Sequence, residues 1–189
     1  MTVAVDAGDS CDESSSACSL GAAAEWAATQ TGRIVELTLQ AGEYELDAPL
    51  RFDASSGAAE VVLSAAAGAE VVLRPSARRR RLQSGDTTTA ALLYVSSGSL
   101  TLERVQLRDT AAGEHAVLVD GGTLLLREST FSANLGPSAL EVAGGEVTVE
   151  DGAFTDNAGS AVTVSGGSFV ASGSSFSRNG GAALHVTAG

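Results

Sequence analysis

The chain has 189 residues, of which 44% are hydrophobic but only 4% aromatic, and it holds 22 Gly and 3 Pro. These values predict one domain with a core of Val, Leu and Ala, and they exclude a disordered Pro/Gly-rich tract. All 11 basic residues are Arg, and the net charge of −12 excludes a typical nucleic-acid-binding protein, because such binding depends on cations that neutralise phosphates.

The first 33 residues predict a cysteine loop followed by a helix. Cys11 and Cys18 lie in a polar, Ser-rich stretch, which favours a small disulfide loop and hence an oxidising compartment. Two unpaired surface thiols in a cytosolic protein are the alternative. Ser19 stands at an N-cap position, and apolar residues at helical spacing follow as far as Gly32. We expect this helix to cover the open first coil of the fold described next.

Short strands follow from residue 34, and an arginine-rich segment interrupts them. Apolar and polar residues alternate with a period of two, between bends of Gly, Ala and Ser. Residues 75–90 break this rhythm and are predicted to form a loop expelled from one coil. Four adjacent cations in it, Arg78, Arg79, Arg80 and Arg81, repel one another and favour exposure. The loop is a candidate site for an anionic partner or for proteolytic processing, and a solvated insertion is the alternative.

A repeated Phe-x-x-Asn template in the second half of the chain predicts the fold class. The three copies, at Phe131–Asn134, Phe154–Asn157 and Phe176–Asn179, have phenylalanines 23 and 22 residues apart, and double glycines recur at the same intervals. A fixed period of this length is typical of a solenoid. We predict an all-β, right-handed, single-stranded parallel β-helix of the pectate-lyase type, with about 22–24 residues and three strands per coil over residues 34–189.

The repeat also predicts which residues stack in columns. Leu107 precedes the three phenylalanines in an inward column, and Asn134, Asn157 and Asn179 fall at bends. Asn tolerates the left-handed backbone that a bend needs, and its amide can bond the Asn of the coils above and below. Outward charges form further columns, in which opposite charges meet between the first two coils: Glu103, Arg127 and Glu150; and Arg104, Glu128 and Asp151.

Two short motifs resemble a known family of surface proteins. Phe-x-x-Asn followed by Gly-Gly-Ala-Ala-Leu at residues 180–184 resembles the paired tetrapeptides of polymorphic outer membrane proteins. Cys-Ser-Leu at residues 18–20, before an Ala-rich helix, resembles the Cys-Ser-Leu-Arg-Glu-Ala-Ile module that opens many secreted β-helix proteins, although Gly21 and Ala22 replace Arg-Glu. The resemblance implies an extracellular or cell-surface location and roles in adhesion or surface architecture.

Candidate catalytic residues are sparse. Glu103 and Glu150 share a column at a separation that would suit inverting glycoside hydrolysis, with Arg127 between them, but a solvated charge ladder is the favoured interpretation. His115 and His185 are predicted to be surface residues without a Ser-Asp partner. We expect no catalytic site, no cofactor and no bound metal, because no phosphate-binding or calcium-binding loop is present.

The expected function is a non-catalytic structural or adhesive β-helix module of an exported protein. A carbohydrate-active β-helix enzyme and a segment of an extracellular filament are the alternatives. No run approaches the roughly 18 apolar residues of a membrane span, and the opening residues lack the pattern of a signal peptide. Because Gly189 falls where the next double glycine would begin, we expect a fragment whose open end meets further coils or other chains, with polysaccharide as another partner.

Overall fold

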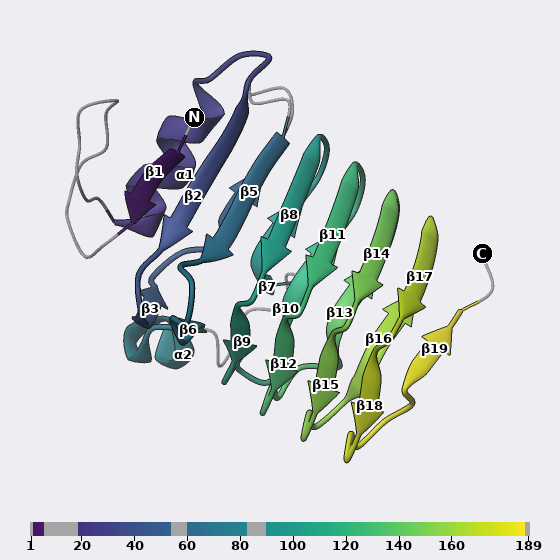
Figure 1. Ribbon diagram of the computed structural model, residues 1–189. Coiled ribbons are helices and arrows are strands. Elements are labelled where there is room, and N and C mark those ends of the chain that lie inside the picture. Colours follow the sequence, from purple (N-terminus) through teal and green to yellow (C-terminus); the bar gives the residue numbers. More distant parts are fainter. Residues whose placement is uncertain (1, 6–18, 54–59, 83–89, 188–189) are drawn as a thin grey trace.

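The computed structural model describes residues 2–5, 19–53, 60–82 and 90–187 as a parallel β-solenoid of about six turns (Figure 1). Each turn contributes one strand to each of three stacked sheets, here named sheets A, B and C. All strand pairs are parallel, since each coil provides the connection to the next. The predicted parallel β-helix is confirmed.

The strands alternate between the sheets in chain order. Sheet A contains β1 (Thr2–Val5), β2 (Ile34–Leu39), β5 (Glu60–Ala65), β8 (Ser99–Glu103), β11 (Thr123–Arg127), β14 (Glu146–Glu150) and β17 (Ser168–Ser172). Sheet B contains β3 (Gly42–Leu46), β6 (Val71–Pro75), β9 (Gln106–Arg108), β12 (Thr130–Ser132), β15 (Ala153–Thr155) and β18 (Ser175–Ser177). Sheet C contains β4 (Leu50–Phe52), β7 (Ala90–Val95), β10 (Glu114–Val119), β13 (Ser138–Val142), β16 (Ser160–Val164) and β19 (Leu184–Val186).

Helix α1 (Leu20–Ala28) begins where the sequence predicts. Ser19 is the N-cap, and its Oγ accepts a hydrogen bond from the N–H of Ala22 at 3.3 Å. The helix contacts β1 and β4, and its face with Leu20, Ala23 and Ala27 is buried in the same core as the coils. The predicted capping helix is therefore present, and it closes the first coil together with β1, which adds a strand beyond β2.

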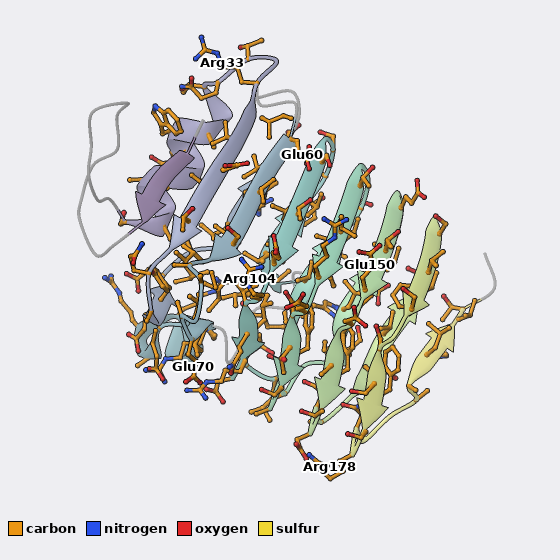
Figure 2. All side chains as sticks on the ribbon, in the orientation of Figure 1. Arg33, Glu60, Glu70, Arg104, Glu150 and Arg178 are labelled. Carbon is orange, nitrogen blue, oxygen red and sulfur yellow. The ribbon has the colours of Figure 1, made fainter. Side chains whose placement is uncertain are left out.

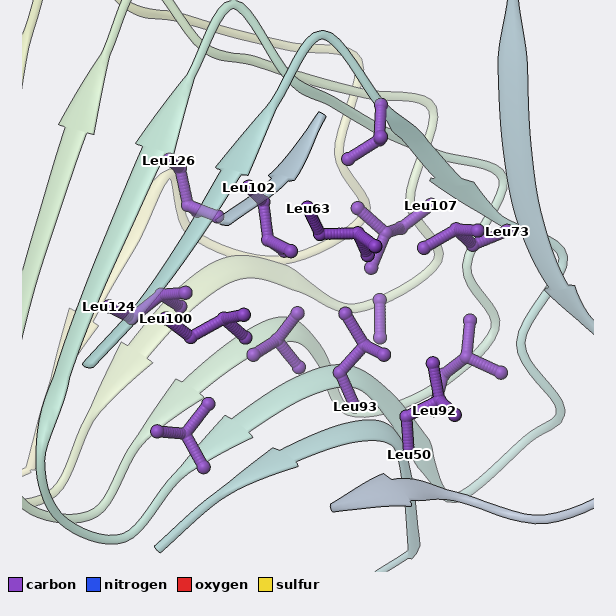
Figure 3. Packing of buried hydrophobic residues seen from close by; sticks show 14 of the residues in the cluster. Leu50, Leu63, Leu73, Leu92, Leu93, Leu100, Leu102, Leu107, Leu124 and Leu126 are labelled. Atoms are coloured by element: carbon purple, nitrogen blue, oxygen red, sulfur yellow. The ribbon is translucent and has the colours of Figure 1, made fainter. Parts of the chain in front are cut away.

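The core is a column of thin aliphatic side chains that runs through the centre of the coils (Figure 3). Leucines from all three sheets meet there, such as Leu63, Leu73 and Leu93, and each is fully buried. Leu100 and Leu124, partners in neighbouring strands, repeat the contact one coil further on. Because each coil packs against the next, burial grows by a similar increment with every turn.

The phenylalanine column follows the predicted register. Leu107 pairs with Phe131, Phe131 with Phe154, and Phe154 with Phe176 in sheet B. The rings of Phe131 and Phe154 are stacked at 4.5 Å between centroids, and those of Phe154 and Phe176 at 5.1 Å. Such aromatic contacts add roughly 0.5–1.5 kcal/mol each beyond the burial of their area.

The asparagine ladder is also confirmed. The Asn134 Nδ2 donates to Oδ1 of Asn157 at 2.9 Å, and the Asn157 Nδ2 donates to Oδ1 of Asn179 at 2.9 Å. Each amide also donates to a backbone carbonyl of the preceding coil, as Asn157 Nδ2 does to the carbonyl of Phe131 at 3.1 Å. These bonds satisfy polar groups inside a corner that would otherwise be buried and unpaired.

The backbone at this corner corrects one detail of the prediction. The left-handed residue of each bend is the one before the asparagine, namely Ala133, Asp156 and Arg178, with φ of 53°, 57° and 53°. The physical reason is that the preceding residue makes the turn, which leaves the asparagine side chain directed inward for the ladder. Ala133, Asp156 and Arg178 can carry any side chain that tolerates this conformation, because theirs are exposed.

The double glycines lie where neighbouring coils approach most closely. Gly145 has φ of 72°, and a Cβ atom there would lie 2.4 Å from the carbonyl oxygen of Gly122 in the preceding coil. A Cβ atom on Gly144 would lie 2.3 Å from the carbonyl oxygen of Asp120. Only glycine therefore fits both positions, which explains why the pair recurs once per coil.

Replacing Asn157 with Ala is expected to destabilise the solenoid, because it removes the central member of the ladder. The Asn134 backbone N–H and the Phe131 carbonyl would lose the side chain that they bond, at roughly 1–3 kcal/mol for each buried group left unpaired. Urea unfolding followed by circular dichroism measures this loss. The matched control is Ser132→Ala, at a half-buried outward position of β12, and an equal loss in both variants would contradict the role of the ladder.

Candidate functional site

Within the described residues, the arginines of the predicted loop at 75–90 belong to a helix. Strand β6 continues through Pro75, helix α2 (Ala77–Leu82) follows, and β7 resumes at Ala90. Arg78 is exposed, but Arg79 is buried, with only 5% of its surface accessible. Arg80 and Arg81 belong to α2, and their side chains lie outside the described part of the chain.

Arg79 is buried, contrary to the predicted exposure, because it forms an ion pair with the buried Glu114. Its Nη2 lies 2.5 Å from Oε1 of Glu114 and donates to the carbonyl of Ala91 at 2.8 Å. Burial lowers the pKa of Arg79, and the negative charge of Glu114 partly opposes this shift. The Arg79 N–H also bonds Oγ of Ser76, which in turn donates to Asp47. The segment is therefore anchored to β10 in the following coil.

The outward charged side chains of sheet A form ion pairs within and between coils. Glu103, Arg127 and Glu150 do share one column, as predicted. Arg127 Nε donates to Oε2 of Glu150 at 2.8 Å, whereas Glu103 pairs with Arg104 beside it rather than with Arg127. Figure 2 shows Arg104 after β8 and Glu150 at the end of β14. The pairing expected between the first two coils is thus wrong, because Arg127 reaches toward the next coil.

The two histidines lie on the outward face of sheet C, in neighbouring columns. His185 is exposed and belongs to the column Tyr94, Leu118, Glu141, Thr163 and His185, one residue from each of five strands. His115 is buried, with 6% of its surface accessible, which contradicts its prediction as a surface residue. The reason is that all six residues of β10 are buried, so the alternation of exposed and buried residues fails there.

These columns border a groove of about 600 Å³ that runs along sheet C. Its described lining comprises Tyr94, His115, Leu118, Asp120, Pro137, Ser138, Glu141, Ala143, Ser160, Thr163 and His185. Most of these residues lie in β7, β10, β13, β16 and β19, Asp120, Pro137 and Ala143 lie beside these strands, and none belongs to a Phe-x-x-Asn segment. This groove is the candidate functional site.

Hydroxyl groups hold both carboxylates of the groove. The Tyr94 hydroxyl donates to Oδ2 of Asp120 at 3.0 Å, and Ser165 Oγ donates to Oε1 of Glu141 at 2.7 Å. Arg51 lies over the Tyr94 ring, with its Cζ 5.1 Å from the ring centroid. Sequence reasoning missed Tyr94, Asp120 and Glu141, and the one signal that could have found two of them was the shared column position of Tyr94 and Glu141.

The pKa shifts in the groove follow from burial. Burial lowers the pKa of His115, and the hydrogen bond with the Ser138 carbonyl and the charges of Glu141 and Glu114 oppose this shift only in part. Burial also raises the pKa of Tyr94, and its bond to Asp120 acts in the same direction. His115 is therefore a neutral imidazole at neutral pH, and Tyr94 is a neutral donor.

Ser138 connects His115 to Glu141. The His115 Nδ1 lies 2.9 Å from Oγ of Ser138, and that Oγ lies 3.5 Å from Oε2 of Glu141. The serine thus stands between the imidazole and the carboxylate, whereas activation of a serine nucleophile needs the histidine in the middle. Ser138 is also buried, with 1% of its surface accessible. The arrangement fixes side chains in place and does not prepare a nucleophile.

Other predicted sites receive no test from the structure. Cys11 and Cys18 lie outside the described residues, so the disulfide stays a prediction. The described residues hold no group of three or more His, Cys, Asp or Glu that could bind a metal ion. Among the same residues no helix is long and apolar enough to cross a membrane.

The chain matches no protein-family model and no curated protein.

Replacing Arg79 with Met is expected to destabilise the chain by about 3–5 kcal/mol, because Glu114 would stay buried without its cation. Adding Glu114→Gln should restore much of this loss, since it removes the unpaired charge. Chemical unfolding of the two variants and the wild type measures both effects. The exposed neighbour supplies the control Arg78→Met, and an Arg79→Met variant as stable as this control would refute the buried pair.

The stability of the chain is expected to fall as pH decreases through the range in which His115 titrates. Because the folded pKa lies below the ordinary value of 6.5, the unfolded chain takes up this proton first. The contribution of neutral His115 is therefore fully present above about pH 6.5 and is lost as pH falls toward the folded pKa. Urea unfolding between about pH 7 and pH 5 should show a smaller decline in His115→Gln than in the wild type. The control His185→Gln should lose as much stability as the wild type over this pH range. A loss in His115→Gln as large as that of the wild type would contradict the assignment of the pH dependence to His115.

Proposed function

We propose that the chain is a non-catalytic module of an exported surface or extracellular protein, in which a rigid solenoid presents the sheet C groove for adhesion. The observation that carries this proposal is the position of Ser138 between His115 and Glu141. Groups of catalytic type are present, but they are bonded in an order that suits fixed recognition. The resemblance of the Phe-x-x-Asn repeats to those of surface proteins supports the location.

Rigidity supports an adhesive role. The backbone of each coil is paired on both sides within all three sheets, from β5 to β16 in the described residues. Salt bridges such as Arg178–Asp156, at 2.7 Å, and Arg108–Glu43, also at 2.7 Å, join different coils on the surface. Such exposed pairs are screened by solvent and add little stability, so their main effect is to hold side chains in register. A groove on such a frame loses little conformational entropy when it binds a partner.

A carbohydrate-active enzyme is the second candidate, and a specific feature favours it. Asp120 and Glu141 bring two carboxylates to one lateral groove, together with the imidazoles of His115 and His185. Glycoside hydrolysis uses a pair of carboxyl groups on opposite sides of the scissile bond. Each of these carboxylates accepts a hydrogen bond from a hydroxyl group, Asp120 from Tyr94 and Glu141 from Ser165, which fixes its position in the groove.

The two candidates differ in what happens to a bound polysaccharide. We expect beads that carry the chain to adhere to polysaccharide-coated surfaces, while soluble polysaccharide incubated with the chain releases no new reducing ends. Reducing-end assays on neutral, acidic and amino polysaccharides measure the release. Release that is lost in Glu141→Gln but kept in Glu146→Gln, an exposed glutamate of sheet A, would establish the enzyme instead. Absence of both adhesion and release would leave a purely structural module.

A further inference from the structure

The charge of the sheet C groove has one sign. Its described lining includes the carboxylates of Asp120 and Glu141 and contains no Arg side chain. His115 is neutral because it is buried. Arg51, which pairs with Tyr94 in the adjacent strand, lies over the Tyr94 ring and is not part of this lining. A ligand that enters the groove thus meets net negative charge, which favours cationic groups and disfavours acidic ones.

A buried histidine points a free ring nitrogen toward the same space. His115 lines the groove, and in the described part of the chain its hydrogen bonds are made by Nδ1, to the carbonyl and the hydroxyl of Ser138. The second ring nitrogen, Nε2, is thus left for a partner that enters the groove. Among the described residues Nε2 is not a buried atom without a partner, so it stays accessible from the groove.

The outward positions along the groove recur once per strand, at a fixed distance. The column from Tyr94 to His185 crosses five neighbouring strands, which lie about 4.8 Å apart, so it spans about 19 Å. This spacing is comparable to the length of one pyranose ring in an extended glycan. An extended peptide exposes side chains on one face about every 6.6–6.8 Å and falls out of step with the coils. A glycan along the solenoid axis can place one sugar against each coil.

We propose that the sheet C groove binds an extended glycan whose sugars carry free amino groups, with Asp120 and Glu141 as the acceptors for its ammonium groups. The Tyr94 and Ser165 hydroxyls hold these carboxylates in place before the ligand arrives. Nε2 of His115 faces a sugar hydroxyl, and Leu118, Pro137 and Ala143 supply apolar surface for the ring faces. This inference rests on the proposed adhesive role and names the class of its ligand.

Titration calorimetry with three hexasaccharides tests the assignment. We expect the β-1,4-linked glucosamine hexamer to bind, the N-acetylglucosamine hexamer to bind about tenfold more weakly, and the galacturonic acid hexamer not to bind, because a charge-assisted hydrogen bond accounts for about a factor of ten or more. Asp120→Asn and Glu141→Gln should each weaken glucosamine binding by about tenfold on the same grounds. Asp120 is exposed, so its variant tests the site even where Glu141→Gln fails to fold.

Glu146→Gln is the matched control, because it removes the same charge from an exposed position on sheet A. An equal loss of affinity in Glu146→Gln would reduce the binding to general attraction toward an acidic protein and would overturn the proposal. Equal binding of all three hexamers, or binding of none, would overturn it as well. Recovery of shortened hexamers after titration would refute the non-catalytic function while supporting the ligand class.

Discussion

Equivalent residues of successive coils lie one strand spacing apart, about 4.8 Å, and this short distance governs what each position can hold. Inside, it stacks like on like, so Phe131 and Phe154 meet face to face. At one corner it brings an asparagine amide within reach of the next, as between Asn157 and Asn179. At the opposite extreme it leaves Gly145 no room for a side chain. The stacked core, the asparagine ladder and the glycine bend therefore all follow from this one distance between coils.

Positions that obey this spacing could be predicted, since a contact between coils appears in the sequence as a fixed interval. The pairs Phe131–Phe154 and Asn134–Asn157 both lie 23 residues apart in the chain, and both form the expected contact. The capping helix was predictable for a different reason, because Ser19 and the helical spacing after it are local signals. What could be predicted is therefore either periodic or local.

The features that could not be predicted from the sequence are neither periodic nor local. Arg79 and Glu114 meet only because α2 turns back onto the following coil, and four consecutive arginines indicate exposure when taken alone. His115 lies in a strand whose six residues are all buried, so the period of two that marks an outward side chain is absent. The groove combines Tyr94 and Glu141 from one column with Asp120, which follows a different position of the coil. Its chemistry depends on the shape of sheet C, which the repeat does not encode.

The ion pair between Arg79 and Glu114 divides the solenoid into two parts with different evolutionary freedom. The coils from β11 to β19 present matching surfaces above and below, so a whole coil could be duplicated or deleted there and the new neighbours would still fit. The coil that carries α2 cannot move in this way, because Arg79 would arrive beside a coil without Glu114. Changes in length should therefore accumulate beyond β10, while the N-terminal coils stay fixed as a unit.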